Sequence, residues 1–325
     1  MTATDTARQV PRVLFVVGKG GVGRSTVATA LALDFAARGE RVLLVEWTVT
    51  EVISPWFGKP AVAPGFTPVP LAPRLFVMNY ELRAVLKSYF VEHLGLDVFY
   101  RRVIEGAAVQ RLIEAAPGLA ELLFIGQLWW LTTLAENEAG LRFDRIVVDA
   151  PATGHAVSLL DLPAAMETFG ASGLLALEVG RIGQMMKDPK WTGAVVVSLP
   201  EALVAEETGE LVPRVAKDLG RPPLAVFVNR SARGLVRPDA DTAWLAALSP
   251  PPRPGTRDSL ELLQRELSAR VAHEAALRTA MAGQTRDGVV SLPEQLALIG
   301  ARPPLEVVQA LAPAVRAWLS GAEAP

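Results

Sequence analysis

One stretch near the N-terminus decides the fold: "RVLFVVGKGGVGRSTVATALAL", residues 12–33. An apolar, β-branched run leads into a glycine-rich loop and then into a segment with helical periodicity. The loop nearly matches the phosphate-binding pattern G-x-x-x-x-G-K-[ST], except that Arg24 stands where the pattern has lysine. A second apolar run, 41–46, follows a predicted helix over 25–38, so the stretch predicts a strand–helix–strand unit.

Further apolar runs extend this unit into a larger sheet. Seven runs in all are typical of buried, mostly parallel strands, at 12–17, 41–46, 74–79, 144–149, 193–199, 224–229 and 288–292. Their alternation with helical segments predicts an α/β fold, a doubly wound sheet in a single domain over 1–325. The strand-free interval 81–141 predicts a helical insertion subdomain, and the five prolines within 237–259 predict an exposed loop.

Composition excludes several classes of protein. The net charge of -2, without clusters of lysine or arginine, argues against nucleic-acid binding. The absence of cysteine excludes disulfides and thiolate metal sites and fits a cytoplasmic protein. The N-terminus lacks the apolar core of a secretory signal. Residues 119–136 are the most apolar segment, but Glu121 and Gln127 interrupt them, so we expect no stable membrane insertion.

The glycine-rich loop carries the predicted chemistry. Its glycines let the backbone wrap around anionic oxygens, and the following helix adds its positive N-terminal end. Ser25 is placed to ligate magnesium through its hydroxyl. Arg24 keeps a positive charge near the phosphates, and we assign it to the catalytic set. Because it is bulkier than lysine, we expect binding to survive better than catalysis. The predicted phosphate-binding set is Gly18, Lys19, Gly20, Gly21, Val22, Gly23, Arg24, Ser25 and Thr26.

Two motifs together carry a family resemblance. "GKGGVGRST" resembles the deviant Walker A loop K-G-G-x-G-K-[ST] of the SIMIBI class of NTPases. "VVDAPATGHAVSLLDLP", residues 147–163, resembles the segment D-x-A-P-T-G-H-x-x-x-L-L-x-x-P of ArsA and of the ATPase that targets tail-anchored membrane proteins. "PEALVAEET" (200–208) and "FVNR" (227–230) follow in the family's order. The resemblance implies a P-loop NTPase fold and an ATPase that uses ATP or ADP with Mg²⁺.

The resemblance also implies catalytic residues. Lys19 is similar to the signature lysine, which in the family reaches across a dimer to the partner's nucleotide, as an arginine finger does. Asp149 is similar to the Walker B aspartate that holds magnesium. The second switch is matched by Pro151, Thr153, Gly154 and His155. Without the resemblance, Asp149 would be interpreted as a strand-end cap and His155 as a loop residue.

Two further positions resemble the family's base-binding residues. Asn229 follows a predicted strand and matches the asparagine that reads adenine. Pro293 stands where a C-terminal loop packs on the base. Both matches are short, and ordinary loop residues are the alternative.

The chain departs from the family after its second strand. The family has two aspartates there, and in "EWTVTEVISPWFG" (46–58) their positions hold Thr48 and Pro55. Neither residue is a carboxylate base. Glu46 or Glu51 could take over this role, and we assign Glu46 to the catalytic set, with solvated or capping glutamates as the alternative. The loop resembles that of bacterial ArsA-like proteins that often occur as two unlike subunits.

The apolar stretch 119–134, with Trp129 and Trp130, has two interpretations. It could form a groove for an apolar client helix, or it could bury the insertion against the sheet, which we favour because apolar stripes at helical spacing are usually core. The metalloid site and the zinc clasp known from the family both need cysteines, which this chain lacks.

The sequence therefore predicts a subunit of a dimeric, ArsA-like ATPase. It would bind MgATP or MgADP and couple hydrolysis or nucleotide state to dimer opening and closing. The partner would be a second copy or, by preference, a related subunit. The alternative is a catalytically weakened regulatory or scaffold subunit beside a competent paralogue, with Arg24 and Thr48 favouring this alternative and Lys19, Ser25 and Asp149 favouring an active ATPase.

Overall fold

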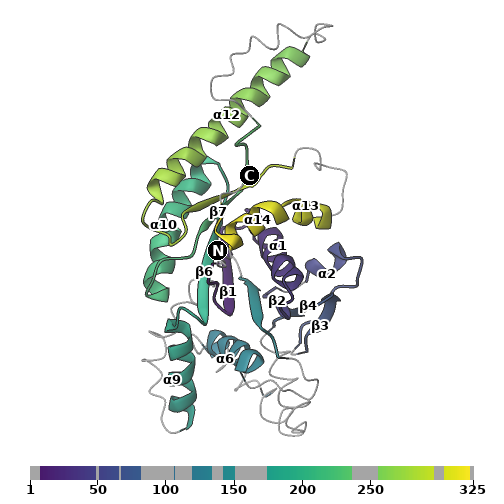
Figure 1. The fold of residues 1–325 in the computed structure, drawn as a ribbon, viewed down its shortest axis with the longest axis vertical. Coiled ribbons are helices and arrows are strands. Elements are labelled where there is room, and N and C mark those ends of the chain that lie inside the picture. Colours follow the sequence, from purple (N-terminus) through teal and green to yellow (C-terminus); the bar gives the residue numbers. More distant parts are fainter. Residues whose placement is uncertain are drawn as a thin grey trace, which may run out of the picture.

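A computed structural model describes residues 8–48, 51–65, 67–81, 106, 119–133, 142–150, 174–235, 255–295 and 304–322. They form one sheet with helices on both faces (Figure 1). The strands are β1 (Val13–Gly18), β2 (Val42–Glu46), β3 (Val69–Ala72), β4 (Leu75–Asn79), β5 (Arg145–Asp149), β6 (Thr192–Ser198), β7 (Val226–Ser231) and β8 (Val289–Pro293). The helices are α1 (Arg24–Ala37), α2 (Ile53–Trp56), α6 (Leu119–Thr133), α9 (Leu174–Lys187), α10 (Ala202–Leu219), α12 (Thr256–Ala280), α13 (Pro304–Ala310) and α14 (Ala312–Ser320).

The sheet confirms the predicted α/β architecture. Its strand order is β3-β4-β2-β5-β1-β6-β7-β8, and every neighbouring pair is parallel except β3 with β4. All seven apolar runs form strands. The sequence did not reveal β3, because this short edge strand buries only Leu71 and so lacks a clear hydrophobic pattern.

Two hydrophobic cores lie on opposite faces of the sheet. Side chains alternate along a strand, so Phe15 of β1 packs into one core and Leu14 into the other. The first core includes residues of α6, α9, α10 and α12, and the second includes residues of α1, α13 and α14. Each strand of the sheet centre is therefore buried on both sides, which explains its continuous apolar runs.

The described part of the 119–134 stretch is α6, and it lies in the core. Phe124, Ile125 and Leu128 are fully buried, and Trp129 and Trp130 pack against the same cluster. A helix that is apolar on all sides is normally buried, so α6 agrees with the core interpretation. Residues 82–105, 107–118 and 134–141 are outside the described residues, and the insertion subdomain stays a prediction.

The C-terminal half differs in detail from the predicted boundaries. Helix α12 already begins at Thr256, inside the predicted loop 237–259, whereas 236–254 lie outside the described residues. Two short helices, α13 and α14, follow each other near the end of the chain. Pro313 stands in the first turn of α14, where a missing N–H is tolerated, but it cannot continue a helix from α13.

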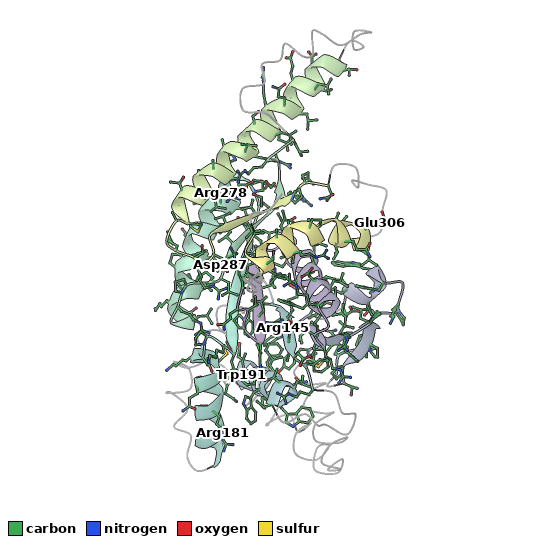
Figure 2. All side chains as sticks on the ribbon, viewed as in Figure 1. Arg145, Arg181, Trp191, Arg278, Asp287 and Glu306 are labelled. Carbon is green, nitrogen blue, oxygen red and sulfur yellow. The ribbon has the colours of Figure 1, made fainter. Side chains whose placement is uncertain are left out.

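Polar anchors fix the amino end of the sheet. Arg145, at the centre of Figure 2, donates to a carboxylate oxygen of Glu40 at 2.6 Å and to the carbonyl oxygen of Val10 at 2.8 Å. Its guanidinium also lies 4.2 Å from the centre of the Phe35 ring.

Within the described residues, no helix combines the length and apolarity that crossing a membrane requires.

Candidate nucleotide site

The glycine-rich loop joins the carboxyl end of β1 to α1, at the middle of the sheet. Gly23 is the N-cap of α1 and has a φ of 90°, and no side chain caps the helix. A Cβ at Gly23 would lie 2.3 Å from the Nδ2 atom of Asn229, so both the backbone angle and the space require glycine. The first N–H groups of α1 therefore point to a position where an anion can bind them.

Ser25 and Asp149 meet beside this loop. Parallel pairing of β1 with β5 sets Asp149 opposite Val16. The Ser25 hydroxyl donates to Asp149 Oδ2 at 2.5 Å, and the other oxygen of Asp149 is buried without a hydrogen-bond partner among the described residues. Hydroxyl and carboxylate oxygens are ligands that Mg²⁺ prefers, so this pair fits the predicted magnesium site.

Burial favours the neutral form of the Asp149 carboxyl group. Desolvation raises the pKa of Asp149, while the hydrogen bond from Ser25 and the charge of Arg24 oppose the rise. A divalent cation favours the charged form of a neighbouring carboxylate. The site is therefore better suited to a carboxylate with a bound cation than to a carboxylate alone.

The Arg24 side chain reaches the end of β5. Its Nη1 group donates to the carbonyl oxygen of Ala150, the residue after Asp149. Burial lowers the pKa of Arg24, and the charge of Asp149 opposes this effect. The guanidinium thus has a protein partner at the position where the common motif has a lysine for phosphate.

Lys19 forms an ion pair with Glu207 of α10 in the same chain. The two side chains are 42% and 37% exposed, so solvent reaches the pair. Glu207 lies in the quoted stretch 200–208 but is not among the predicted site residues. Only the fold joins these two residues, because 188 positions separate them in the chain.

Asn229 contacts the loop through a hydrogen bond to the backbone. Its Nδ2 group donates to the carbonyl oxygen of Val22 at 3.0 Å, and its Oδ1 accepts from the Arg230 N–H at 3.0 Å. Pro293 ends β8, the neighbour of β7, and is exposed. The base-binding roles of Asn229 and Pro293 stay predictions.

Glu46 and Glu51 form a buried carboxyl pair at the end of β2. Each is 2% exposed, and the two side chains are hydrogen-bonded to each other. Burial raises the pKa of Glu46 to about 9, and Glu51 and Asp149 add to this rise. Glu46 therefore carries a proton near pH 7 in this arrangement.

The carboxyl pair organises the segment that follows β2. Glu46 accepts the N–H groups of Val52 at 3.2 Å and Ile53 at 3.3 Å. Glu51 accepts those of Ser54 at 2.5 Å and Val62 at 2.9 Å. These bonds match the capping alternative for the two glutamates, and a catalytic role of Glu46 stays a prediction.

The remaining predicted residues divide into two groups. Thr48 is half-buried after β2, and Pro55 is exposed in α2, so the structure supplies no carboxylate at either position. Gly18 ends β1, Gly20 and Gly21 lie in the loop, and Thr26 lies in the first turn of α1. The second-switch residues Pro151, Thr153, Gly154 and His155 lie outside the described residues.

The fold and this site together define a P-loop nucleoside triphosphatase. A family model described as anion-transporting ATPase, ArsA_ATPase, matches residues 11–172. The chain belongs to this ArsA ATPase family.

Named relatives agree with this assignment. ATPase BagA of Mycobacterium tuberculosis is 32% identical over 233 residues, which cover 70% of this chain and 67% of the relative. The arsenical pump-driving ATPase of Escherichia coli is 29% identical over 213 residues, covering 59% of this chain and 34% of the relative. ATPase GET3 of Rhodotorula glutinis is 28% identical over 227 residues, covering 66% and 59%.

Proposed function

We propose that this chain is an ATPase subunit that binds MgATP and MgADP and releases phosphate as part of a dimer. The observation that carries the proposal is the 2.5 Å contact between the Ser25 hydroxyl and Asp149 beside a glycine-rich loop. When bound, magnesium would neutralise phosphate charge. Ser25 and Asp149 would hold it, and the N–H groups at the start of α1 would bind phosphate oxygens.

The surroundings of Lys19 support a role in a dimer. Its ion pair with Glu207 is partly exposed, and such pairs contribute about 0–1 kcal/mol to stability. Lys19 can therefore exchange Glu207 for the more concentrated charge of a partner's nucleotide at small cost. A dimer with a second copy or with a related subunit would meet this condition, and the heterodimer is our preferred assembly.

Two observations favour the second candidate, a catalytically weakened subunit beside a competent paralogue. Arg24 donates to the Ala150 carbonyl, and burial raises the pKa of Glu46 to about 9, so that its protonated form dominates near pH 7. A protonated carboxyl cannot take a proton from water. A carrier role for an apolar helix lacks support from the described part of α6, because Phe124, Ile125 and Leu128 belong to the core.

Phosphate release and nucleotide binding by the purified chain test this proposal. We expect calorimetric titration to show magnesium-dependent ADP binding that Asp149→Asn weakens, and phosphate release that rises with protein concentration and that Lys19→Ala abolishes. The weakened-subunit candidate predicts binding without release by the chain alone, and release when a competent related subunit is added. Absence of magnesium-dependent nucleotide binding would contradict both candidates.

A further inference from the structure

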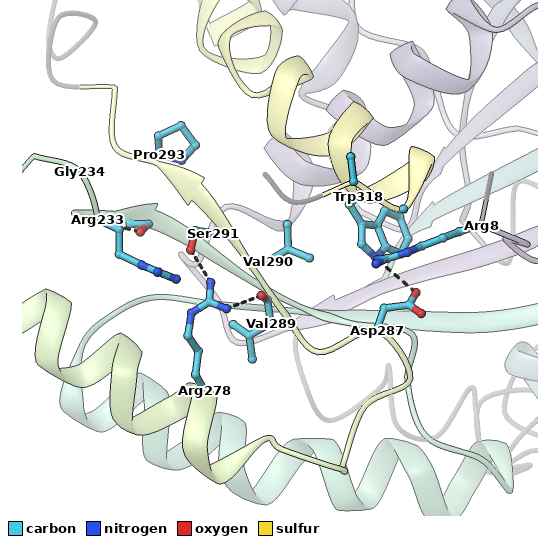
Figure 3. Close-up of a pocket in the computed structure, with 13 residues that line it drawn as sticks. Arg8, Arg233, Gly234, Arg278, Asp287, Val289, Val290, Ser291, Pro293 and Trp318 are labelled. Atoms are coloured by element: carbon cyan, nitrogen blue, oxygen red, sulfur yellow. Dashed lines mark hydrogen bonds and ion pairs between the residues drawn. The ribbon is translucent and has the colours of Figure 1, made fainter. Parts of the chain in front are cut away.

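A pocket opens along the outer edge of the sheet, beside β8, and has a volume of about 630 Å³ (Figure 3). Residues before β1, at and after the end of β7, on α12 and at the end of α14 contribute to its wall. Among its described lining residues, only Pro293 also belongs to the predicted nucleotide site. The pocket is therefore distinct from the phosphate-binding loop.

Backbone donors of β8 lie on the pocket side of the strand. The Val226 N–H donates to the Gly288 carbonyl oxygen at 3.1 Å, which fixes the phase of the parallel ladder between β7 and β8. In such a ladder, alternate residues face the neighbouring strand, so the backbone groups of Val289 and Ser291 face outward. Arg278 confirms this direction, because its Nη1 group donates to the Val289 carbonyl oxygen at 2.7 Å.

Three arginine side chains line the same pocket. Figure 3 shows Arg233 and Arg278 at the end near Ser291, and Arg8 at the other end near Trp318. The side chains of Arg8, Arg233 and Arg278 are 26%, 53% and 31% exposed. Trp318 is buried, and its indole N–H has no hydrogen-bond partner among the described residues. The wall is therefore rich in hydrogen-bond donors.

The carboxylates near this wall accept hydrogen bonds from only some of the N–H groups of the arginines. Glu274 is fully buried and accepts hydrogen bonds from the hydroxyls of Ser231 and Ser291, each at 2.5 Å, and from Arg278 Nη2 at 3.2 Å. Arg233 lies farther away, with 3.9 Å between its Nη1 atom and Glu274 Oε1. Glu274 is thus satisfied by other groups, and the guanidinium of Arg233 keeps N–H groups for a ligand.

Asp287, the second carboxylate near this wall, pairs with two arginines. Its Oδ2 atom lies 3.7 Å from Arg8 Nη1 and 2.9 Å from Arg286 Nη2. The charged residues of the wall and the groups paired with them thus comprise four guanidinium groups and the carboxylates of Glu274 and Asp287. Glu294, which follows β8, is paired with Arg270 at 3.0 Å. The local charge is positive, although the whole chain has a net charge of -2.

We propose that this pocket binds a small organic anion, with its carboxylate or phosphate group at the Arg233–Arg278 end. Guanidinium groups bind both kinds of anion through paired, charge-assisted hydrogen bonds. A volume of about 630 Å³ suits a small molecule rather than a bare ion. The body of the ligand would lie along β8 on Val289 and Val290, both of which line the pocket.

Phenyl phosphate, benzoate and benzyl alcohol test this proposal in calorimetric titrations of the full chain. Excess MgADP is included so that the phosphate-binding loop is occupied, and the titrations are repeated without nucleotide. We expect one equivalent of at least one of the two anions to bind in both conditions, and benzyl alcohol not to bind. The anion that binds more tightly distinguishes phosphate from carboxylate ligands.

Two variants on arginines locate the binding. Arg233→Gln should weaken anion binding about tenfold, the effect of one charge-assisted hydrogen bond. Arg265→Gln is the matched control, because Arg265 is exposed on α12 and is not among the described lining residues. No binding of either anion up to roughly 10 mM, equal binding of benzyl alcohol, or equal effects of the two variants would overturn the proposal.

Discussion

Lys19 and Glu207 form an ion pair that ties the phosphate-binding loop to α10 within one chain. If Lys19 acts on a partner's nucleotide, this pair must open when the dimer closes. Glu207→Gln should then strengthen nucleotide-dependent dimerisation, since Lys19 no longer has to leave a carboxylate. Because the pair is partly exposed, its loss should change the unfolding free energy by less than about 1 kcal/mol.

Sedimentation with and without ATP checks this effect, and Glu206→Gln is the matched control because Glu206 is exposed on the same helix. Equal dimerisation of the two glutamine variants would show that the ion pair between Lys19 and Glu207 does not oppose dimerisation.

Lys19→Ala should leave nucleotide binding in place and slow phosphate release by the assembled dimer by about 1000-fold or more, as loss of an arginine finger does.

Arg24→Lys should increase phosphate release. A lysine is too short and too differently shaped to reproduce the forked guanidinium of Arg24, which donates to Ala150 in the chain alone, and its ammonium should point to the loop phosphates. We expect the rate of phosphate release to rise at least about tenfold, because one hydrogen-bond donor aimed at the charge that develops in the transition state has an effect of this size or larger. Arg24→Gln serves as the uncharged comparison. An unchanged rate of phosphate release for Arg24→Lys would indicate that the segment around Thr48, and not Arg24, limits catalysis.

Asp149→Asn should weaken magnesium-dependent nucleotide binding by about 10- to 100-fold, because it removes a charged oxygen from the Ser25 pair. Titrations with magnesium and with EDTA measure this loss. Binding without magnesium should change little in the variant. A fall of equal size in both conditions would instead indicate damage to the loop.

Glu46 should make the folded state less stable as pH rises. Its pKa of about 9 in the folded chain exceeds the ordinary value of 4.5, so the folded state holds a proton that the unfolded state releases. The contribution of Glu46 to the free energy of unfolding is fully present below about pH 4.5. It falls by up to about 1.4 kcal/mol per pH unit as the pH rises toward 9. Denaturant unfolding at several pH values should show a flatter profile for Glu46→Gln, while exposed Glu210→Gln should follow the parent chain.

Gly23→Ala should abolish nucleotide binding, whereas Gly39→Ala should not. Both glycines have nearly the same φ, 90° and 92°, so alanine strains the backbone similarly, by about 1–2 kcal/mol. Only at Gly23 would the new Cβ also meet Asn229, at 2.3 Å, while the space around Gly39 is open. Titration with MgADP and thermal unfolding of both variants separate the two effects, and equal binding by both would contradict the role of this contact.

The sequence by itself determined seven strands of the sheet, its α/β class and the phosphate-binding loop. Buried parallel strands have continuous apolar runs, and the glycines, Ser25 and the Asp149 motif are local patterns that a linear sequence displays. The resemblance carried by these motifs also led to the ArsA family, which the matched relatives support. The edge strand β3 escaped because a short, half-exposed strand leaves little hydrophobic pattern.

Only the tertiary structure decided which side chains become partners. Lys19 meets Glu207, Arg24 meets Ala150, and Glu46 shares a buried hydrogen bond with Glu51. The first two contacts join segments far apart in the chain, and the third depends on burial, which a linear pattern does not measure. The arginine-lined pocket beside β8 arises in the same way, because the fold brings Arg8, Arg233 and Arg278 to one sheet edge.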